Sequence, residues 1–292
     1  MNISLRKISI FGKFPFIKLQ QIIDNPKYLL HLIIKNIWYK FDRKDYSSKY
    51  QNIDILEPNE TLKILVSNHC SFARFSDGEF DILTGAGIYP PDSNWSQLWS
   101  SELEKKLKQV LSSTDDRLFI AVDPKETFLS TKEKQHKIPF EYNMWIDMKR
   151  MMWKFLHEGR QYGHCHLFIK KNAPDFEWDI FRNYVENYDV IVVTGNTKAI
   201  KHLSIGNTTY FIDVGTNDAF SNLNVIEGRV LDCIKGNKLD KKNTIVFASL
   251  GPTACILAHE LLSYDIRVWD TGHMFEFADK KFMEEVFKNE RA

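Results

Sequence analysis

Two short runs of consecutive apolar residues constrain the fold of this chain more than any other feature. One is Val190-Ile191-Val192-Val193 and the other is Ile245-Val246-Phe247-Ala248. A strand that is apolar on both faces must be covered on both, as in parallel sheets that lie between layers of helices. Segments of helical length separate these runs from their neighbours. We therefore predict a Rossmann-like, doubly wound α/β fold with a mostly parallel sheet.

The same pattern of short apolar runs and longer amphipathic segments continues from about residue 60 to the end of the chain. The expected strands are Lys63–Ser67, Arg117–Val122, His164–Ile169, Asp189–Thr194, Thr209–Val214, Thr244–Ser249 and Ile266–Trp269. The expected helices are Ser101–Ser113, Glu141–His157, Phe176–Tyr188 and Thr253–Leu262. No apolar run is long enough to span a bilayer, and the N-terminus does not read as a secretory signal.

Composition excludes several classes of protein. Of the 292 residues, 43% are hydrophobic and 26% are charged, which is typical of a globular protein and not of a disordered one. The net charge of +1 gives no global field that would attract nucleic acid. Four scattered cysteines without a C-x-x-C pair fit a reducing compartment, so we expect a cytoplasmic chain.

The charge is concentrated at one end. Residues 1–50 contain ten Lys/Arg and three Asp/Glu, whereas residues 51–292 are acidic overall. We expect residues 1–50 to form a basic, amphipathic, helical segment that Pro26 divides in two, and residues 51–292 to form one domain. One interpretation is an arm that contacts the inner face of the cell membrane peripherally, where some acceptors are lipid-linked. The other is a packing helix or a contact in a homo-oligomer.

In open parallel sheets, ligands bind outside the carboxyl ends of the strands. Candidate functional residues should therefore follow the apolar runs closely. This rule selects four places, which are Arg74–Glu79, Thr194–Thr197, Ser249–Thr253 and Asp270–His273.

The first place contains two carboxylates, Asp77 and Glu79, on either side of Gly78. In a turn, both could reach one hard cation through oxygen atoms. With Arg74 nearby, that cation could stabilise a departing diphosphate. Taken alone, the pattern is more typical of a helix N-terminus, where acidic residues favour the positive end of the dipole.

The other three places offer donor-binding groups. Gly195 and Asn196 follow the longest apolar run, and such a turn directs backbone N–H groups toward phosphate. Gly251, Pro252 and Thr253 open a helix, with the proline in its first turn, and suit a diphosphate or a nucleoside. Asp270 and His273 add a carboxylate and an imidazole. The chain contains neither a G-x-G-x-x-G sequence nor a P-loop lysine.

Taken together, these blocks resemble the GT-D glycosyltransferases. The blocks are R-F-S-D-G-E-F at residues 74–80, L-G-P-T-A-C-I-L-A at residues 250–258 and D-T-G-H at residues 270–273. The resemblance implies a nucleotide-sugar donor, commonly a UDP-hexose. It further implies a manganese-type ion (Mn²⁺ or Mg²⁺) at Asp77 and Glu79. It places residues 251–253, Asp270 and His273 along the active crevice.

Two departures from the family pattern affect the expected site. Ser76 occupies a position where glycine is usual, and the acidic residues after His273 stand in a different register. We nominate Glu276 as the catalytic base, with Asp270 as the second candidate, because an inverting transfer needs a carboxylate to accept the acceptor proton. A retaining transfer needs no such base.

The sequence thus predicts a metal-dependent hexosyltransferase that acts on an acceptor glycan in polysaccharide, lipopolysaccharide or glycoprotein assembly. A nucleotide-sugar hydrolase and a non-catalytic glycan-binding or scaffold subunit remain as alternatives. His164 and His166, two residues apart on an expected strand, could bind zinc. Because no further ligand at suitable spacing is evident, a structural role is favoured for both.

Overall fold

A computed structural model of the protein describes residues 19–30, 32–33, 52–89, 96–124, 152, 154–275 and 280–287. Its centre is an eight-stranded sheet with the order β1-β4-β3-β2-β8-β7-β5-β6, in which every pairing is parallel. This confirms the predicted fold class. The strands are β1 (Asp54–Ile55), β2 (Ser71–Phe75), β3 (Leu118–Val122), β4 (Gln161–His164), β5 (Asp189–Thr194), β6 (Thr208–Asp213), β7 (Thr244–Ser249) and β8 (Arg267–Asp270).

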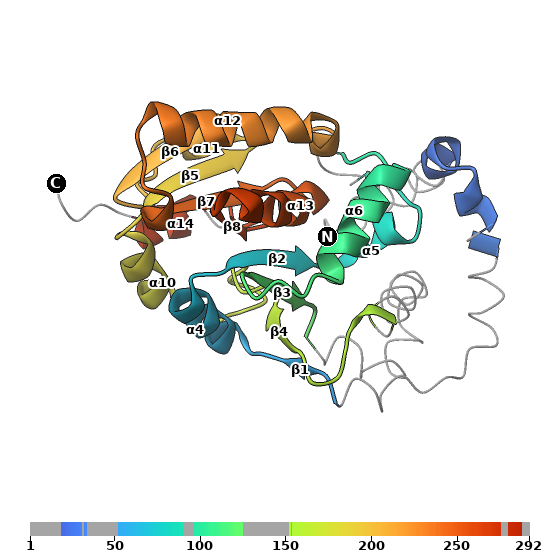
Figure 1. Ribbon diagram of the computed structural model, residues 1–292, viewed down its shortest axis with the longest axis horizontal. Helices are drawn as coiled ribbons and strands as arrows, with labels where there is room; N and C mark the ends of the chain where they lie inside the picture. The colour runs from blue at the N-terminus through green and yellow to red at the C-terminus, as the bar shows by residue number, and fades with distance from the viewer. Residues whose placement is uncertain are drawn as a thin grey trace, which may run out of the picture.

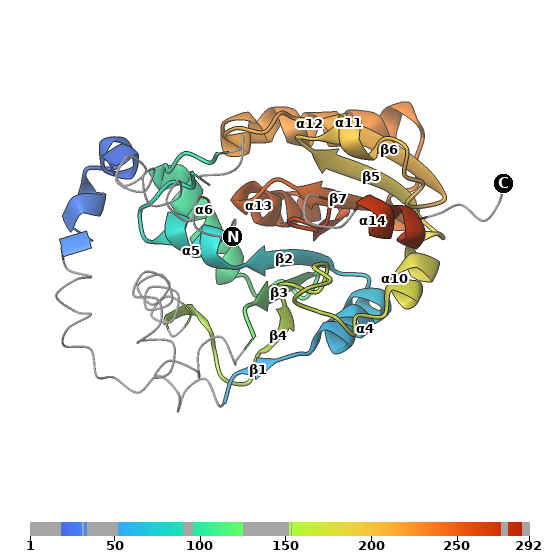
Figure 2. The same ribbon diagram turned by 180° about the vertical axis from the view of Figure 1, so that it is seen from behind.

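Helices cover both faces of the sheet, so the molecule has three layers (Figure 1). One hydrophobic cluster joins the sheet to α5 (Asp77–Leu83), α6 (Ser101–Leu111), α12 (Leu223–Gly236) and α13 (Pro252–Glu260). A second cluster joins the other face to α4 (Pro58–Asn68), α10 (Trp178–Val185), α11 (Thr197–Ile200) and α14 (Lys280–Val286). Figure 2 shows α4, α10 and α14 from this second side. Short 3₁₀ turns at Ala219–Asn222, Lys241–Asn243 and Leu261–Tyr264 complete the described elements.

The two apolar runs became the strands that the sequence predicts. β5 pairs with β6 and with β7 over six residues each, and Val190 to Val193 are fully buried. The predictions for β3, β6 and β8 are also confirmed to within one or two residues, as are those for α6 and α13, and α10 is confirmed to within three. The expected helix Glu141–His157 lies mostly outside the described residues.

One predicted strand is wrong and another is displaced. Lys63–Ser67 belongs to α4, which begins with Pro58 in its first turn and a capping box between Glu57 and Glu60. The first long strand is instead β2, whose five residues are all buried although one of them is Arg74. The run His164–Ile169 contributes only His164 to β4. His164 and His166 therefore do not share the face of a strand.

The sheet consists of two halves that meet between β2 and β8. On one side β2 pairs with β3 along all five residues. On the other side its register with β8 is the single pair Phe72 and Trp269. Beyond that pair, the carboxyl ends of β2 and β8 are bridged by side chains instead of a continuous ladder. This seam is where a ligand crevice is expected in a doubly wound sheet.

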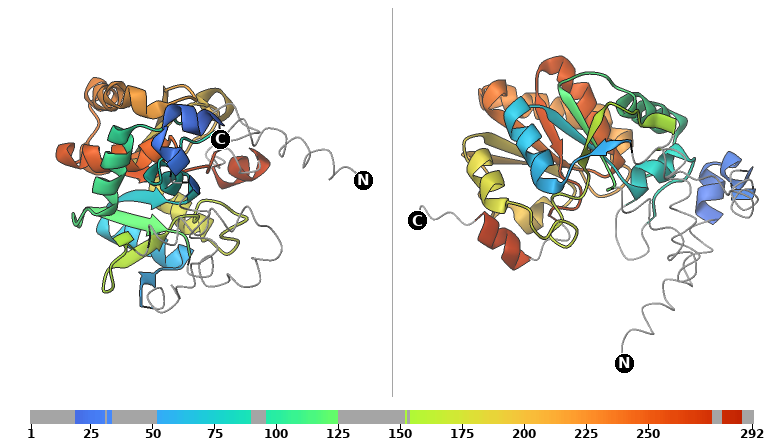
Figure 3. Two further views of the ribbon diagram at one scale, coloured as in Figure 1. Left: turned by 90° about the vertical axis from the view of Figure 1, so that its right-hand side faces the viewer. Right: turned by 90° about the horizontal axis from the view of Figure 1, so that it is seen from below.

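Residues 19–30, with residues 32 and 33, lie beside the turn that follows α5, as the right-hand view of Figure 3 shows. Residues 19–24 and 27–30 are helical and flank Asn25 and Pro26, which confirms the break at the proline. Gln21 Nε2 donates to the Gly87 carbonyl at 2.8 Å, and Asn25 Nδ2 donates to the Gly85 carbonyl at 2.9 Å. The polar side of this segment therefore faces the domain. Among the described residues, no helix is both long and apolar enough to cross a bilayer.

Candidate active site at the carboxyl ends of the strands

An ion pair between Arg74 and Asp270 occupies the seam. Both side chains are buried, and Arg74 Nη1 lies 3.9 Å from Asp270 Oδ1. Asp270 Oδ2 also accepts from the Arg74 backbone N–H at 3.4 Å, where a neighbouring strand would otherwise supply a carbonyl. Arg74 Nε donates to the Cys165 carbonyl just beyond β4. The arginine thereby ties β8 to the far side of β3.

The neighbouring elements enclose the Arg74 guanidinium closely on two sides. Cys255 on α13 donates from Sγ to the Arg74 carbonyl at 2.8 Å. Gly272, at a φ of 51°, donates its N–H to Asp270 Oδ1 at 2.9 Å. A Cβ atom on Gly272 would overlap the Arg74 guanidinium. The glycine is therefore required both by its backbone conformation and by the arginine.

Arg74 Nη1 is buried and has no hydrogen-bond partner among the described residues. A distance of 3.9 Å to Asp270 is too long for a hydrogen bond. An unsatisfied, buried N–H on a charged group costs on the order of 1–3 kcal/mol or more. The Arg74 guanidinium is therefore ion-paired with Asp270, but its Nη1 atom has no hydrogen-bond acceptor among the described residues.

Asp77 and Glu79 stand at the start of α5 but point to different environments. Asp77 is exposed, whereas Glu79 is buried and accepts the Ser76 N–H at 2.9 Å in a capping box. Burial raises the pKa of Glu79 to about 8, and the negative charge of nearby Asp270 adds to the effect. In this structure Glu79 thus caps the helix, as the sequence pattern alone would favour.

In the part of the chain that the structure describes, buried acidic groups outnumber buried basic ones around the seam. Glu79, Asp123 and Asp270 are each less than a tenth exposed, and Arg74 is the buried cation beside them. Burial raises the pKa of Asp270, although Arg74 opposes the shift. Buried carboxylates in this excess favour the binding of a cation or the uptake of protons.

The turns after β7 and β5 lie at the same edge, and their side chains are largely used within the protein. Thr253 is fully buried and its hydroxyl donates to Gln97 Oε1 at 3.2 Å. Gly251 has a φ of 56° and precedes the buried Pro252. These residues fix the shape of the turn, and Gly251 is the partly exposed one.

Gly195 and Asn196 follow β5. A Cβ atom on Gly195 would collide with the Gly215 backbone, so the glycine allows the loops after β5 and β6 to pack closely. Asn196 is exposed, and its backbone N–H lies 3.5 Å from the Thr194 hydroxyl. His273 is half-buried beyond Gly272. Glu276, the nominated base, lies outside the described residues.

A family model described as the glycosyltransferase GT-D fold matches residues 72–288, the part of the chain that contains this seam. The chain belongs to the GT-D family of glycosyltransferases.

Two curated relatives match the GT-D chain over most of its length. A probable glycosyl transferase, Gly, of Streptococcus gordonii is 23% identical over 241 residues, which are 77% of this chain and 32% of that protein. Glycosyltransferase GlyD of Streptococcus pneumoniae is 22% identical over 231 residues, which are 74% of this chain and 26% of that protein. The chain therefore spans only about a third to a quarter of these relatives.

Two solved structures share the GT-D chain's fold. One, a highly conserved domain of unknown function 1792 described as having a distinct glycosyltransferase fold, gives a TM-score of 0.64 at 20% identity. The match covers 84% of this chain and 87% of that one. A glycosyltransferase of the same domain type from Streptococcus sanguinis gives 0.60 at 20% identity, covering 77% and 83%.

The structure adds site residues that the sequence analysis of this GT-D chain missed. Asp123 directly follows β3, so the strand-end rule could have selected it. Its Oδ1 atom accepts from the Ser76 hydroxyl at 3.5 Å. Gln97 links Thr253 to Asp218, and Cys255 joins α13 to Arg74. No sequence pattern points to Gln97 or Cys255, because their partners are distant along the chain.

Proposed function

We propose that this chain transfers a hexose from a nucleotide diphosphate sugar, UDP-linked, to an acceptor glycan, and that Mn²⁺ or Mg²⁺ assists it. The observation that carries the proposal is the buried Arg74 guanidinium with an unpartnered Nη1 at the carboxyl edge of a GT-D sheet. A diphosphate would supply the missing acceptor. Guanidinium and phosphate form strong, charge-assisted hydrogen bonds.

We assign different roles to the residues around Arg74. Arg74 would donate to the diphosphate, while Asp270 holds the guanidinium in place through its ion pair. Residues 251–253, Gly195, Asn196 and His273 would form the walls of the donor pocket, since all lie at the carboxyl edge. Pre-organised donors of this kind stabilise the charge that develops on the leaving group.

Asp77 and Glu79 would hold the divalent cation. Their oxygen atoms suit Mn²⁺ or Mg²⁺, and the excess of buried carboxylates beside them fits a bound cation. When bound, the ion supplies positive charge that stabilises the departing diphosphate. Glu79 Oε2 accepts the Ser76 N–H, which leaves the other carboxylate oxygen as its donor atom for the ion.

The hydrogen bonds that Asp270 already accepts support Glu276 as the catalytic base of an inverting transfer. Asp270 accepts from the backbones of Arg74 and Gly272 and is 3% exposed, so an acceptor hydroxyl has little access to it. Asp270 then serves as a positioning residue for Arg74. Glu276, which lies outside the described residues, stays the nominated base.

We also propose that residues 19–33 contact an anionic membrane surface, which would bring a lipid-linked acceptor to the cytoplasmic face. Their buried side chains are Gln21, Asn25 and Tyr28, while apolar side chains point outward. The outward ones are Leu19, Ile23, Leu29, Leu30 and Ile33, which are between 47% and 62% exposed. Residues 1–50 are strongly basic, and the charge complements anionic lipid.

Calorimetric titration tests the donor assignment. UDP-hexoses and other nucleotides are titrated into the wild-type chain with Mn²⁺ and with EDTA, and into a D77A/E79A variant. We expect one UDP sugar to bind only with Mn²⁺, and the variant to lose at least about tenfold in affinity, as removing an ion pair partner costs over 1 kcal/mol.

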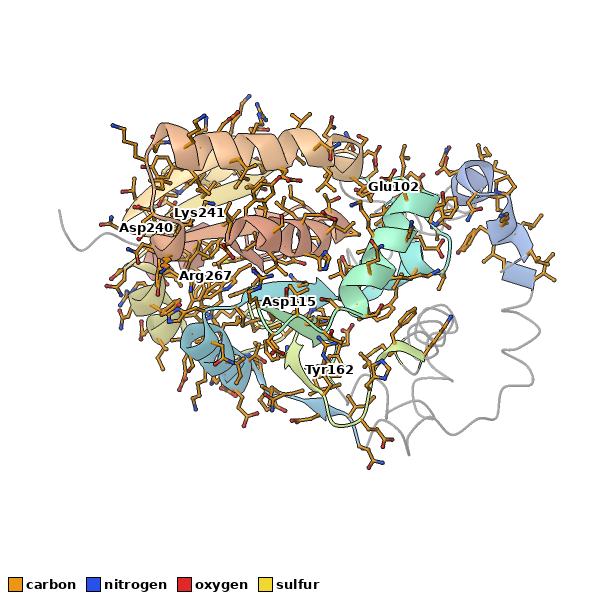
Figure 4. All side chains as sticks on the ribbon, in the orientation of Figure 1. Glu102, Asp115, Tyr162, Asp240, Lys241 and Arg267 are labelled. Atoms are coloured by element: carbon orange, nitrogen blue, oxygen red, sulfur yellow. The ribbon has the colours of Figure 1, made fainter. Side chains whose placement is uncertain are left out.

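A matched control removes two acidic residues from the first turn of the neighbouring helix α6. Glu102, labelled in Figure 4, and Glu104 are mutated to alanine, and this E102A/E104A variant should bind like wild type. If no nucleotide binds to the folded wild-type chain, the donor site is refuted and a glycan-binding subunit is favoured. If donor is consumed equally with and without acceptor, the chain is a hydrolase.

A further inference from the structure

Three side chains of the types that bind transition metals meet at the ends of β3 and β4. Asp123 is the residue after β3, and Cys165 and His166 are the two residues after β4. The parallel register sets Val122 beside His164, so the residues that follow them are neighbours. Their ligand atoms all lie within 4.8 Å of one another. Among the described residues, this is the group with that geometry.

Hydrogen bonds hold this group in place without using all of its ligand atoms. His166 Nε2 contacts Asp123 Oδ1 at 2.7 Å, and the His166 backbone N–H donates to His164 Nδ1 at 3.1 Å. The Cys165 N–H donates to the Val122 carbonyl at 3.0 Å. The backbone that carries Cys165 and His166 is therefore fixed against β3, and a ligand would find the site largely preformed.

Two polar atoms of the group are buried without a partner in the part of the chain that the structure describes. They are Asp123 Oδ2 and His166 Nδ1. The Asp123 side chain is 2% exposed, so water does not readily satisfy it. When His166 donates from Nε2 to Asp123, the tautomer leaves a lone pair on Nδ1. A buried carboxylate oxygen and a buried imidazole lone pair both lack a positive partner.

We propose that Asp123, Cys165 and His166 form a zinc site, separate from the oxygen-only pair Asp77 and Glu79. Thiolate, imidazole and carboxylate together are the donor set of Zn²⁺, whereas Mg²⁺ and Mn²⁺ prefer oxygen ligands alone. Zinc bonds of ~2.0–2.3 Å place ligand atoms roughly 3.3–3.7 Å apart in a tetrahedron. Side-chain movements of about 1 Å would therefore bring the three ligand atoms to these distances around one zinc ion.

The charge of the surroundings also favours a divalent ion at this place. Asp123, Glu79 and Asp270 are buried, and Arg74 is the buried cation among them. Zinc would balance Asp123 and the Cys165 thiolate, and Arg74 would remain paired with Asp270. Three protein ligands leave a fourth position for water or for a group of the donor or acceptor. The proposal stands on these residues and does not rest on the proposed sugar transfer.

Cobalt substitution tests this site directly. The wild-type chain, stripped of metal with a chelator and dialysed, is titrated with Co²⁺ and then with Zn²⁺. We expect one equivalent of Co²⁺ to give a thiolate-to-cobalt charge-transfer band and the visible bands of a tetrahedral ion. Zn²⁺ should then displace it. C165S should abolish the charge-transfer band, and H166Q should weaken Zn²⁺ binding by at least about 100-fold.

The controls separate this site from other thiols and from the acidic motif. Cys233 is the partly exposed thiol on α12, so C233S should leave the spectrum unchanged. D77A/E79A should also keep it, even if donor binding is lost. Far-UV circular dichroism shows whether C165S and H166Q are folded. A wild-type spectrum without a charge-transfer band, or one that C233S removes, would overturn the zinc site.

Discussion

At the scale of single residues, Arg74 determines the chemistry of the seam. It is a charged residue inside a strand whose five positions are all buried. Such a residue costs stability unless its charge and its N–H groups have partners. Asp270 and the Cys165 carbonyl supply some of them, and one nitrogen stays unpartnered. We interpret this incomplete pairing as support for our proposal that the seam binds an anion.

Replacing Gly272 by alanine tests how closely Gly272 packs against the Arg74 guanidinium. The new Cβ would overlap the guanidinium, and alanine at a φ of 51° adds about 1–2 kcal/mol of backbone strain. We expect G272A to lower the free energy of unfolding by about 3 kcal/mol, measured by urea denaturation, and to weaken donor binding. G159A is the control, since Gly159 has a φ of 82° and no atom near its Cβ position. Equal losses in both variants would contradict the clash.

The buried thiol of Cys70 should make stability depend on alkaline pH. Burial raises the pKa of Cys70 to about 11 from an ordinary value of 9.0. Between these pH values the unfolded chain loses the proton and the native chain keeps it, so stability falls as pH rises. The loss amounts to about 2 kcal/mol across the window. In C70A, denaturation curves between pH 9 and pH 11 should lack this fall in the free energy of unfolding. If the free energy of unfolding falls with pH as it does in wild type, Cys70 is excluded as the cause.

At the scale of elements, the accuracy of the predictions follows how much local sequence determines each element. β5 and β7 are central strands whose side chains are buried on both faces, and their consecutive apolar residues predict this burial directly. β2 could not be predicted, because Ser71, Arg74 and their neighbours are buried by partners nearly 200 residues away. The run Lys63–Ser67 has strand-like composition, but Leu62 and Leu65 share a helical face and Pro58 starts the helix.

The residues of the candidate site were also predictable only where local sequence and topology determine their position. The strand-end rule predicts the position of Asp270 and of the turns after β5 and β7, because topology alone decides which edge they occupy. Asp123 was missed although it obeys the same rule. The rule gives only the edge of the sheet and leaves open which way each side chain points. Glu79 shows this, since its carboxylate turns back to the Ser76 N–H.

The helical segment of residues 19–33 carries a prediction of its own. I23E/L30E should reduce sedimentation with vesicles of anionic lipid by about tenfold, because each substitution removes an apolar side chain that is about 60% exposed. The control V225E changes a side chain on α12 that is 59% exposed. V225E should bind like wild type, and vesicles of neutral lipid should bind little of any variant. Undiminished binding of I23E/L30E would refute this contact surface.

At the scale of the whole molecule, the two edges of the sheet carry different sets of polar residues. Every strand pairing is parallel, so Arg74, Asp123, Asp270 and the glycine turns, which lie at or just after strand ends, gather at one edge of the sheet. At the opposite edge Arg267, labelled in Figure 4, donates to the Tyr184 hydroxyl at 2.7 Å and lies over the Tyr188 ring. In that second cluster the arginine and the aromatic rings contact one another, and Arg267 Nη2 is also buried without a hydrogen-bond partner among the described residues. The edge with Arg74 also carries buried carboxylates and glycine turns, and it is there that we propose ligand binding.

The position of β8 next to β2 has a consequence for how the chain is made. The sheet's centre joins a strand that is synthesised early to the last strand of the sheet, about 190 residues later. Until β8 has left the ribosome, β2 presents an unpaired, apolar edge, which is the kind of surface that aggregates or recruits chaperones. We therefore expect the sheet and the site at the seam to be completed together, and only after β8 has been synthesised.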